Sequence, residues 1–256
     1  MTATKAGSLR GTEIATTQVS ADNYRALYQI GWIAAIISVL LGVLEIALTM
    51  LPNGTSDNMS SINDWFLLLQ DDTFMGLRDL GLVNLGLVMA GVMLYLAFYL
   101  VLRRANPSWA LVGLVMYLMG SAIFFATNRA FPLLDLSNQY TLASSASQRA
   151  TLEAAGQALL SVGQSHTPGT FLAFFISGAA GIAMSIAMLS SAEFSKIVAW
   201  IGIVGSIGLV IYEISNDFMI GVGGSVMGIA TVGGILTLIW QVVVAWKLYK
   251  LSTSTA

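Results

Sequence analysis

The chain has 256 residues, of which 56% are hydrophobic and only 9% are charged, and its formal net charge is −2. The mean hydropathy of +0.79 is typical of chains embedded in lipid and excludes an ordinary soluble domain. A charge so near zero, with basic residues scattered along the chain, excludes nucleic acid as the expected partner. The absence of cysteine from the sequence excludes disulfides, thiolate nucleophiles and cysteine metal sites.

Six apolar runs are each long enough to cross a bilayer, whose hydrocarbon core takes about 20 helical residues. The sequence predicts spans over residues 30–51, 80–102, 109–131, 171–189, 197–214 and 222–248. Prolines lie at the edges of these runs, where a helix can begin or end, at Pro52, Pro107, Pro132 and Pro168. The expected fold class is all-α: a polytopic membrane protein with six transmembrane helices in one membrane domain, residues 28–250.

Short polar segments flank this domain and help to orient it. Residues 1–27 and 251–256 are predicted tails, and the first lacks the apolar core and cleavage site of a signal peptide. Lysine and arginine near span ends favour the cytoplasmic side of a membrane. Placing both termini in the cytoplasm leaves only Arg78, Arg129 and Arg149 outside. We therefore expect a multi-pass protein whose N-terminus and C-terminus are both cytoplasmic.

Two connections between spans are long, residues 52–79 and 132–170, and both fall on the outer side in this topology. The first surrounds a short apolar patch, residues 65–69, with aspartates. That patch is too short to cross the bilayer, so we expect it to rest at the level of the lipid headgroups.

The second connection contains a segment rich in Ala, Leu, Glu and Gln, residues 148–162. Apolar side chains recur in it at helical spacing: Leu152, Ala155, Leu159 and Val162. The expected N-cap is Ser144 or Ser145, and Gly163 with the following Pro168 ends the segment. The sequence therefore predicts an outer amphipathic helix that caps the bundle.

Polar and charged side chains within the spans gather toward their outer ends. Such side chains are costly in lipid and normally face a bundle interior or a cavity. The candidate ligand-binding residues are Glu45, Asp79, Asn84, Asn128, Arg129, Glu213 and Asn216. Small residues recur every three or four positions on several spans, which lets helices approach closely. The pattern favours an outward-facing polar pocket that binds or transports a small molecule or lipid, with Glu45 and Glu213 as proton or cation acceptors and Arg129 as counter-charge.

Other interpretations of these residues stay open. Arg129 could instead serve only to neutralise Glu45 or Glu213, with the other polar side chains capping helices or reaching the headgroups. A second class of function is a non-catalytic membrane partner or stress-sensor subunit, whose 132–170 connection contacts another protein and whose bundle is filled. A third is an intramembrane acid/base enzyme that uses Glu45 with Glu213. No nucleophile motif supports it, and the sequence predicts no catalytic residue, metal site or cofactor; the single histidine, His166, lies in a loop rich in Ser, Gly and Pro.

A family resemblance rests on the outer connection. Asn-Arg at 128–129 is followed by PLLDLSNQY at 132–140 and QRATLEAAGQA at 148–158. In this order of segments the chain resembles the prokaryotic membrane proteins grouped as domain-of-unknown-function family 4386. The resemblance implies a bacterial or archaeal protein of the cell inner membrane, related from the first span to the sixth. It carries no catalytic residue and no ligand across to this chain.

Overall fold

The computed structural model describes residues 3–49, 59, 61–164, 166–219 and 223–253. Every regular element in these ranges is an α-helix, as the sequence predicts. The helices are α1 (Ala3–Thr49), α2 (Ile62–Asp71), α3 (Thr73–Asp79), α4 (Leu82–Leu102), α5 (Pro107–Thr127), α6 (Ala130–Leu142), α7 (Ala146–Gly163), α8 (Phe171–Leu189), α9 (Lys196–Phe218) and α10 (Gly223–Thr253).

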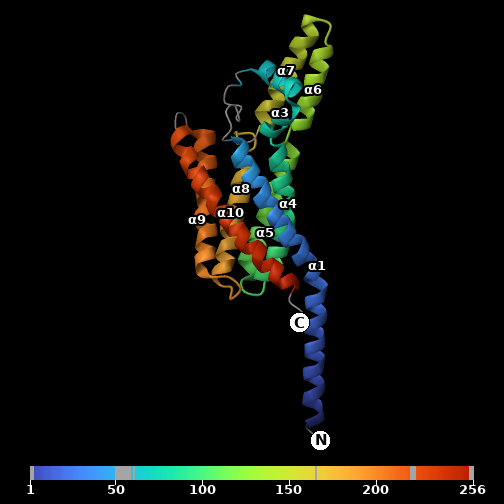
Figure 1. Ribbon diagram of the computed structural model, residues 1–256, viewed down its shortest axis with the longest axis vertical. Coiled ribbons are helices and arrows are strands. Elements are labelled where there is room, and N and C mark those ends of the chain that lie inside the picture. The colour runs from blue at the N-terminus through green and yellow to red at the C-terminus, as the bar shows by residue number, and fades with distance from the viewer. Residues whose placement is uncertain (1–2, 50–58, 60, 165, 220–222, 254–256) are drawn as a thin grey trace.

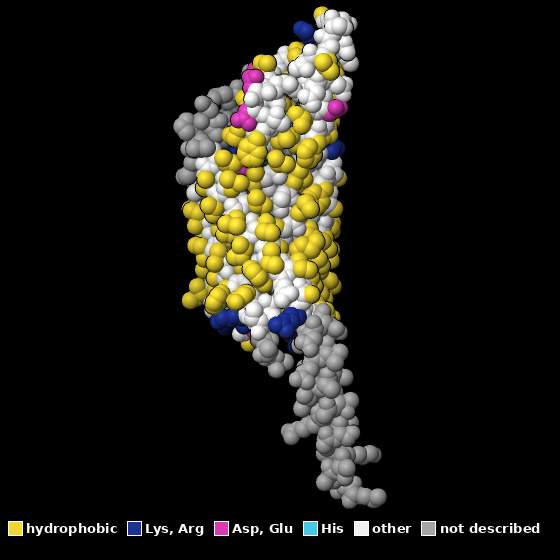
Figure 2. All heavy atoms as spheres, turned by 45° about the vertical axis from the view of Figure 1, so that its right-hand side comes forward, with side chains coloured by type: hydrophobic (Ala, Val, Ile, Leu, Met, Phe, Trp, Pro, Cys, Tyr) yellow, Lys and Arg dark blue, Asp and Glu magenta, His cyan; other side chains and the backbone are white. Residues whose placement is uncertain are grey.

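Six of these helices, α1, α4, α5, α8, α9 and α10, are long and apolar enough to cross a membrane. Large apolar side chains are exposed along them, and Figure 2 shows them as a broad belt across the visible face of the bundle. A belt of this kind is suited to lipid and would be an aggregation hazard in water. The chain is thus a multi-pass membrane protein, and the predicted six spans are confirmed.

Several span boundaries differ from the predicted ones: α1 begins before residue 30, α10 continues past residue 248, and two further differences concern the polar residues. The third span was expected to reach residue 131, but α5 ends at Thr127 because Asn128 leaves the helical conformation and α6 starts anew at Ala130. The fifth was expected to end at residue 214, but α9 continues to Phe218. Glu213 therefore lies within a helix, a turn before its end.

The spanning helices form a closed ring in chain order. Each packs extensively on its two neighbours, in the sequence α1, α4, α5, α8, α9 and α10, with α10 returning to α1. Short turns join α4 to α5 and α8 to α9, as the sequence indicates for antiparallel neighbours. Toward those turns the ring is filled by large side chains, where the Phe98 ring makes edge-on contacts with Phe194 and Trp240.

The remaining helices, α2, α3, α6 and α7, form a cap beyond the other end of the bundle (Figure 1). Helix α2 begins at a capping box, in which Ser61 and Asp64 each accept from the backbone N–H of the other. The patch 65–69 was expected to turn its apolar side chains to the headgroups, but most of them face the interior of the protein. Because α6 and α7 supply an apolar partner surface, Trp65, Phe66 and Leu69 are buried in a core of the cap's own.

The helix predicted to cap the bundle is confirmed as α7, and Ser145 is its N-cap, accepting from the backbone N–H of Gln148. Its buried face, however, is not the predicted stripe. The buried positions are Gly156, Leu160 and Gly163. A Cβ at Gly156 would lie 2.7 Å from the Ile62 side chain, so the absent side chain lets α2 approach here and fixes which face turns inward.

Candidate functional site

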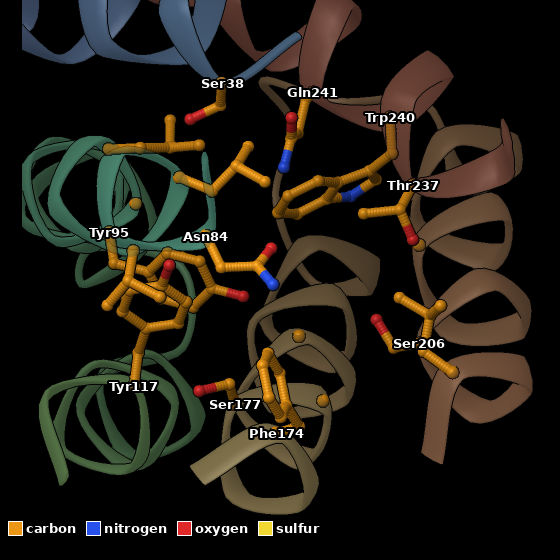
Figure 3. A pocket seen from close by; sticks show the side chains of 18 of the residues that line it. Ser38, Asn84, Tyr95, Tyr117, Phe174, Ser177, Ser206, Thr237, Trp240 and Gln241 are labelled. Carbon is orange, nitrogen blue, oxygen red and sulfur yellow. The ribbon is translucent and has the colours of Figure 1, made fainter. Parts of the chain in front are cut away.

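A cavity of about 250 Å³ lies inside the ring of spanning helices. All six spans contribute to its wall, together with His166 from the connection between α7 and α8. Figure 3 shows the aromatic side chains around it: Tyr95, Tyr117, Phe174 and Trp240. The lining is thus mixed, with aromatic faces alongside a small number of polar groups, as is usual for small-molecule sites.

Small residues open this space. Glycines of α4, α8 and α9 line the cavity at positions 91, 178, 181 and 202. The Tyr117 hydroxyl occupies the place where a Cβ of Gly91 would be, and the Tyr117 ring stacks on Tyr95 with 3.9 Å between centroids. A side chain at Gly91 would therefore displace Tyr117 and change the aromatic wall.

Three polar atoms at the cavity have no hydrogen-bond partner among the described residues. They are Ser38 Oγ of α1, Glu213 Oε2 of α9 and Gln241 Oε1 of α10. Native proteins pair the large majority of their buried polar atoms, because an unpaired one costs about 1–3 kcal/mol. Three such atoms around one space indicate a place where water or a ligand completes the hydrogen bonding.

Glu213 is the charged group of the cavity wall, together with the histidine that it binds. Its carboxylate is 4% exposed, and its Oε1 lies 2.6 Å from Nδ1 of His166. His166 adopts a left-handed backbone conformation (φ 55°), and its ring stacks on Phe174 at 4.3 Å. The Asn216 side-chain amide donates to the His166 carbonyl at 2.8 Å and so holds this strained residue in place.

The pKa of His166 reflects two opposed influences. Burial by itself lowers the pKa of the imidazole, whereas the adjoining Glu213 carboxylate raises it, helped by the charges of Asp217 and Glu45. The carboxylates prevail, so the pKa of His166 lies above its ordinary value. A histidine with this environment can hold a proton near neutral pH.

A second charged cluster joins the cap to the bundle. The guanidinium of Arg78, on α3, lies 3.0 Å from Glu45 Oε1 of α1 and 2.6 Å from Asp79 Oδ1. It also donates to the backbone carbonyl of Glu45. Arg78 is buried (4% exposed), and one arginine here serves two carboxylates.

The seven predicted candidates divide into three places. Asn84 and Glu213 line the cavity, with Asn216 clamping the histidine beside them. Glu45 and Asp79 meet at Arg78, outside the cavity wall. The remaining two, Asn128 and Arg129, lie at the break between α5 and α6.

Arg129 does not act as the predicted counter-charge. Its guanidinium donates to the carbonyls of Ala126 and Asn128, and it makes no ion pair within the described part of the chain. The chain turns at Asn128, whose side chain donates to the Leu80 carbonyl at 3.0 Å and accepts from the N–H of Ala130. That turn places the Arg129 side chain against Gly163, the last residue of α7.

Two residues of these sites were not predicted as such. Arg78 was expected at the membrane interface, at a span end beside Asp79 where an arginine pairs readily; its burial and its second partner, Glu45, were not expected. His166 carried no usable signal, because nothing in a Ser, Gly and Pro-rich segment says that the loop folds inward. Among the described residues, no three His, Asp or Glu side chains come together in a way that could hold a metal ion.

Comparisons with known proteins locate the chain in a family. Neither the curated proteins nor the solved structures include a match to it. The family model described as "Domain of unknown function (DUF4386)" matches residues 73–246, which covers the cap from α3 onward and five of the six spans. The protein is therefore a member of the DUF4386 family of membrane proteins.

Proposed function

We propose that this protein binds a small molecule in the cavity of its membrane bundle. The observation that supports this is the convergence of three buried, unpartnered polar atoms, from α1, α9 and α10, on one aromatic-walled space. A bundle that served only as a scaffold would gain stability by filling that space with apolar side chains. Retaining both the void and the polar atoms favours a binding role over the filled bundle expected for a partner subunit.

We place the cap on the outer face of the cell inner membrane. Figure 2 shows dark blue side chains of lysine and arginine below the apolar belt, at the end of the bundle opposite the cap. By their positions in the chain, the basic residues at the helix ends on that side are Arg103, Arg104, Lys196, Lys247 and Lys250. The positive-inside rule assigns that end to the cytoplasm. In this orientation His166 and Glu213 lie at the outer end of the cavity, and the ligand approaches from outside.

The cavity can be tested by filling it. Leu209 lines it from α9, so Leu209→Trp should occupy the space without removing a polar group. Ile214→Trp is the matched control, because Ile214 is on the same helix and faces out of the bundle. Each protein is purified in lipid nanodiscs, and small molecules retained by it are identified by mass spectrometry.

We expect a defined compound with the wild-type protein and with Ile214→Trp, and its loss, about tenfold or more, from Leu209→Trp. Equal retention by Leu209→Trp would show that the compound binds elsewhere. If no protein retained any compound, and none of a panel of soluble metabolites raised the thermal stability of the wild type, the proposal would be wrong.

A further inference from the structure

The charge of the cavity wall points to the kind of molecule that fits it. Glu213 is the acid among the lining residues, and its Oε1 is already bound to His166. Its Oε2 is buried and has no partner in the described structure. A carboxylate oxygen accepts hydrogen bonds and attracts positive charge, so the group it lacks is a donor, best supplied by a cation.

The rest of the wall suits an organic cation better than a metal ion. Four aromatic rings, Tyr95, Tyr117, Phe174 and Trp240, surround the space (Figure 3), and ring faces attract ammonium groups when water is excluded. The indole N–H of Trp240 is already donated to Met188 Sδ, which leaves its ring as the available surface. A metal ion needs several oxygen ligands at short range, and this wall offers one carboxylate.

We infer that the ligand is a protonated organic amine that takes Glu213 as its counter-ion in exchange for the proton held by His166. This inference rests on the proposed binding function. With His166 protonated, the His166–Glu213 pair is neutral, and an entering ammonium group would leave one uncompensated positive charge in a buried site. Loss of the imidazole proton restores neutrality, and that proton can leave to water because the His166 side chain is about a third exposed.

The surrounding charges leave His166 as the group that gives up the proton. Asp217 on α9 and Glu45 on α1 act on it electrostatically, and Glu45 is itself paired with Arg78 of α3. Helices α4, α5 and α8 carry no Asp, Glu, Lys or Arg, and the lysines of α10 lie in its last turns at the opposite end. Proton and amine therefore compete for one carboxylate, which couples their binding reciprocally.

The test uses two probes of nearly equal shape, 2-phenylethylamine, which is protonated at neutral pH, and 2-phenylethanol, which is neutral. Binding to the full-length protein in nanodiscs is measured by calorimetry from about pH 5.5 to about pH 8. We expect the amine to bind at least about tenfold more tightly than the alcohol at the upper end of the range. Below the pKa of His166, the Kd of the amine should rise by up to about tenfold for each unit by which the pH falls, because one proton must leave for each amine bound. Buffers of different ionisation enthalpy should report the release of close to one proton.

Two variants separate the roles. Glu213→Gln should bind amine and alcohol alike, and Glu153→Gln, an acid-to-amide change in the cap, should behave as wild type. His166→Gln keeps a donor for Glu213, so it should still prefer the amine but lose the pH dependence and the proton release. If Glu213→Gln does not fold, His166→Gln still tests the inference.

Equal affinity of the wild type for amine and alcohol, no saturable binding of either, or a Kd independent of pH would each overturn the inference. These failures are distinguishable from failure of the proposed function. If Leu209→Trp removes a retained compound while 2-phenylethylamine never binds, the cavity is a binding site for another class of molecule.

Discussion

The cap and the bundle of this protein are built on opposite principles. The cap resembles a small soluble core: it buries Trp65, Phe66 and Leu69 together, and side-chain caps begin α2 and α7. The bundle brings its helices together through glycine, alanine and serine, and it retains a void with unpartnered polar atoms around it. In water, large apolar side chains are driven into a core, whereas in lipid that drive is absent and close backbone contact takes its place.

The difference indicates where function lies. The cap packs Trp65, Phe66 and Leu69 into an apolar core, whereas the bundle surrounds a cavity on which three unpaired polar atoms converge, and such atoms gain from a ligand. The cap then serves to position the adjoining end of the cavity, since its last helix, α7, leads directly into the loop that carries His166. Substitutions at the junction of the cap and the bundle, and within each of them, can test this difference.

The largest effect is expected at their junction. Arg78→Met removes the charge that Glu45 and Asp79 share and leaves two carboxylates in a mostly buried place. Breaking a buried ion pair in this way costs about 3–5 kcal/mol, here toward the lower end because Glu45 is partly exposed. The free energy of unfolding in detergent, from denaturant titration, measures the loss.

Arg129→Met is the control for that experiment. Arg129 lies at the start of α6 in the cap but donates only to carbonyl groups, so its removal should cost about 1 kcal/mol or less. Equal losses for the two arginines would show that the Arg78 cluster does not join the regions.

The cap core is tested by two identical changes on one helix. Leu69 is 0% exposed and Leu67 is 60% exposed, both on α2. Leu69→Ala should cost the cap about 2–4 kcal/mol, whereas Leu67→Ala should cost a few tenths. Amide hydrogen exchange resolves the location: with Leu69→Ala, exchange should accelerate in α2, α6 and α7 and remain slow in α8 and α9. Uniform acceleration through α8 and α9 would mean that cap and bundle unfold as one unit.

A pair of glycines tests the packing of the bundle in the same manner. A Cβ at Gly120 would lie 2.8 Å from the Ala173 carbonyl oxygen of α8, but one at Gly228 would meet nothing within 4 Å. Gly120→Ala should therefore force α5 from α8 and cost about 1–3 kcal/mol. Gly228→Ala should be neutral or stabilise the helix by up to about 1 kcal/mol. The melting temperatures of the two variants are compared with that of the wild type. Equal shifts for Gly120→Ala and Gly228→Ala would argue against close packing at Gly120.

The contrast between the regions also explains how far the sequence could be read. Spans follow from composition alone, so all six were predictable, as was α7 from its N-cap Ser145 and its ending at Gly163. The fold of the patch 65–69 was not, because an apolar stretch of that length fits a membrane surface and a small core equally well. Only the partner surfaces on α6 and α7, which come from elsewhere in the chain, decide between them.

Some polar residues of the cavity could be picked out from the sequence, but their partners could not. Glu213 and Asn84 stand out because polar groups in spans are costly, and both line the cavity. Which basic side chain pairs with which acid depends on the path of the connections between helices. Arg78 rather than Arg129 reaches Glu45, because the chain turns at Asn128 after α5. His166 reaches Glu213 from a loop in a backbone conformation that no periodic pattern encodes.

The smallest effect is expected from protonation of His166, the residue at which the cap's last helix meets the bundle. Because its pKa in the folded protein lies above the unfolded value of about 6.5, the proton stabilises the folded state. That contribution is complete below about pH 6.5 and disappears as pH rises through the folded pKa. His166→Gln retains a hydrogen bond to Glu213 but not the charge, so its melting temperature should fall below that of wild type at low pH and approach it at high pH. A gap that stayed constant from about pH 5.5 to about pH 8.5 would mean that His166 joins the two regions by packing on Phe174 alone, and that its proton plays no part in holding them together.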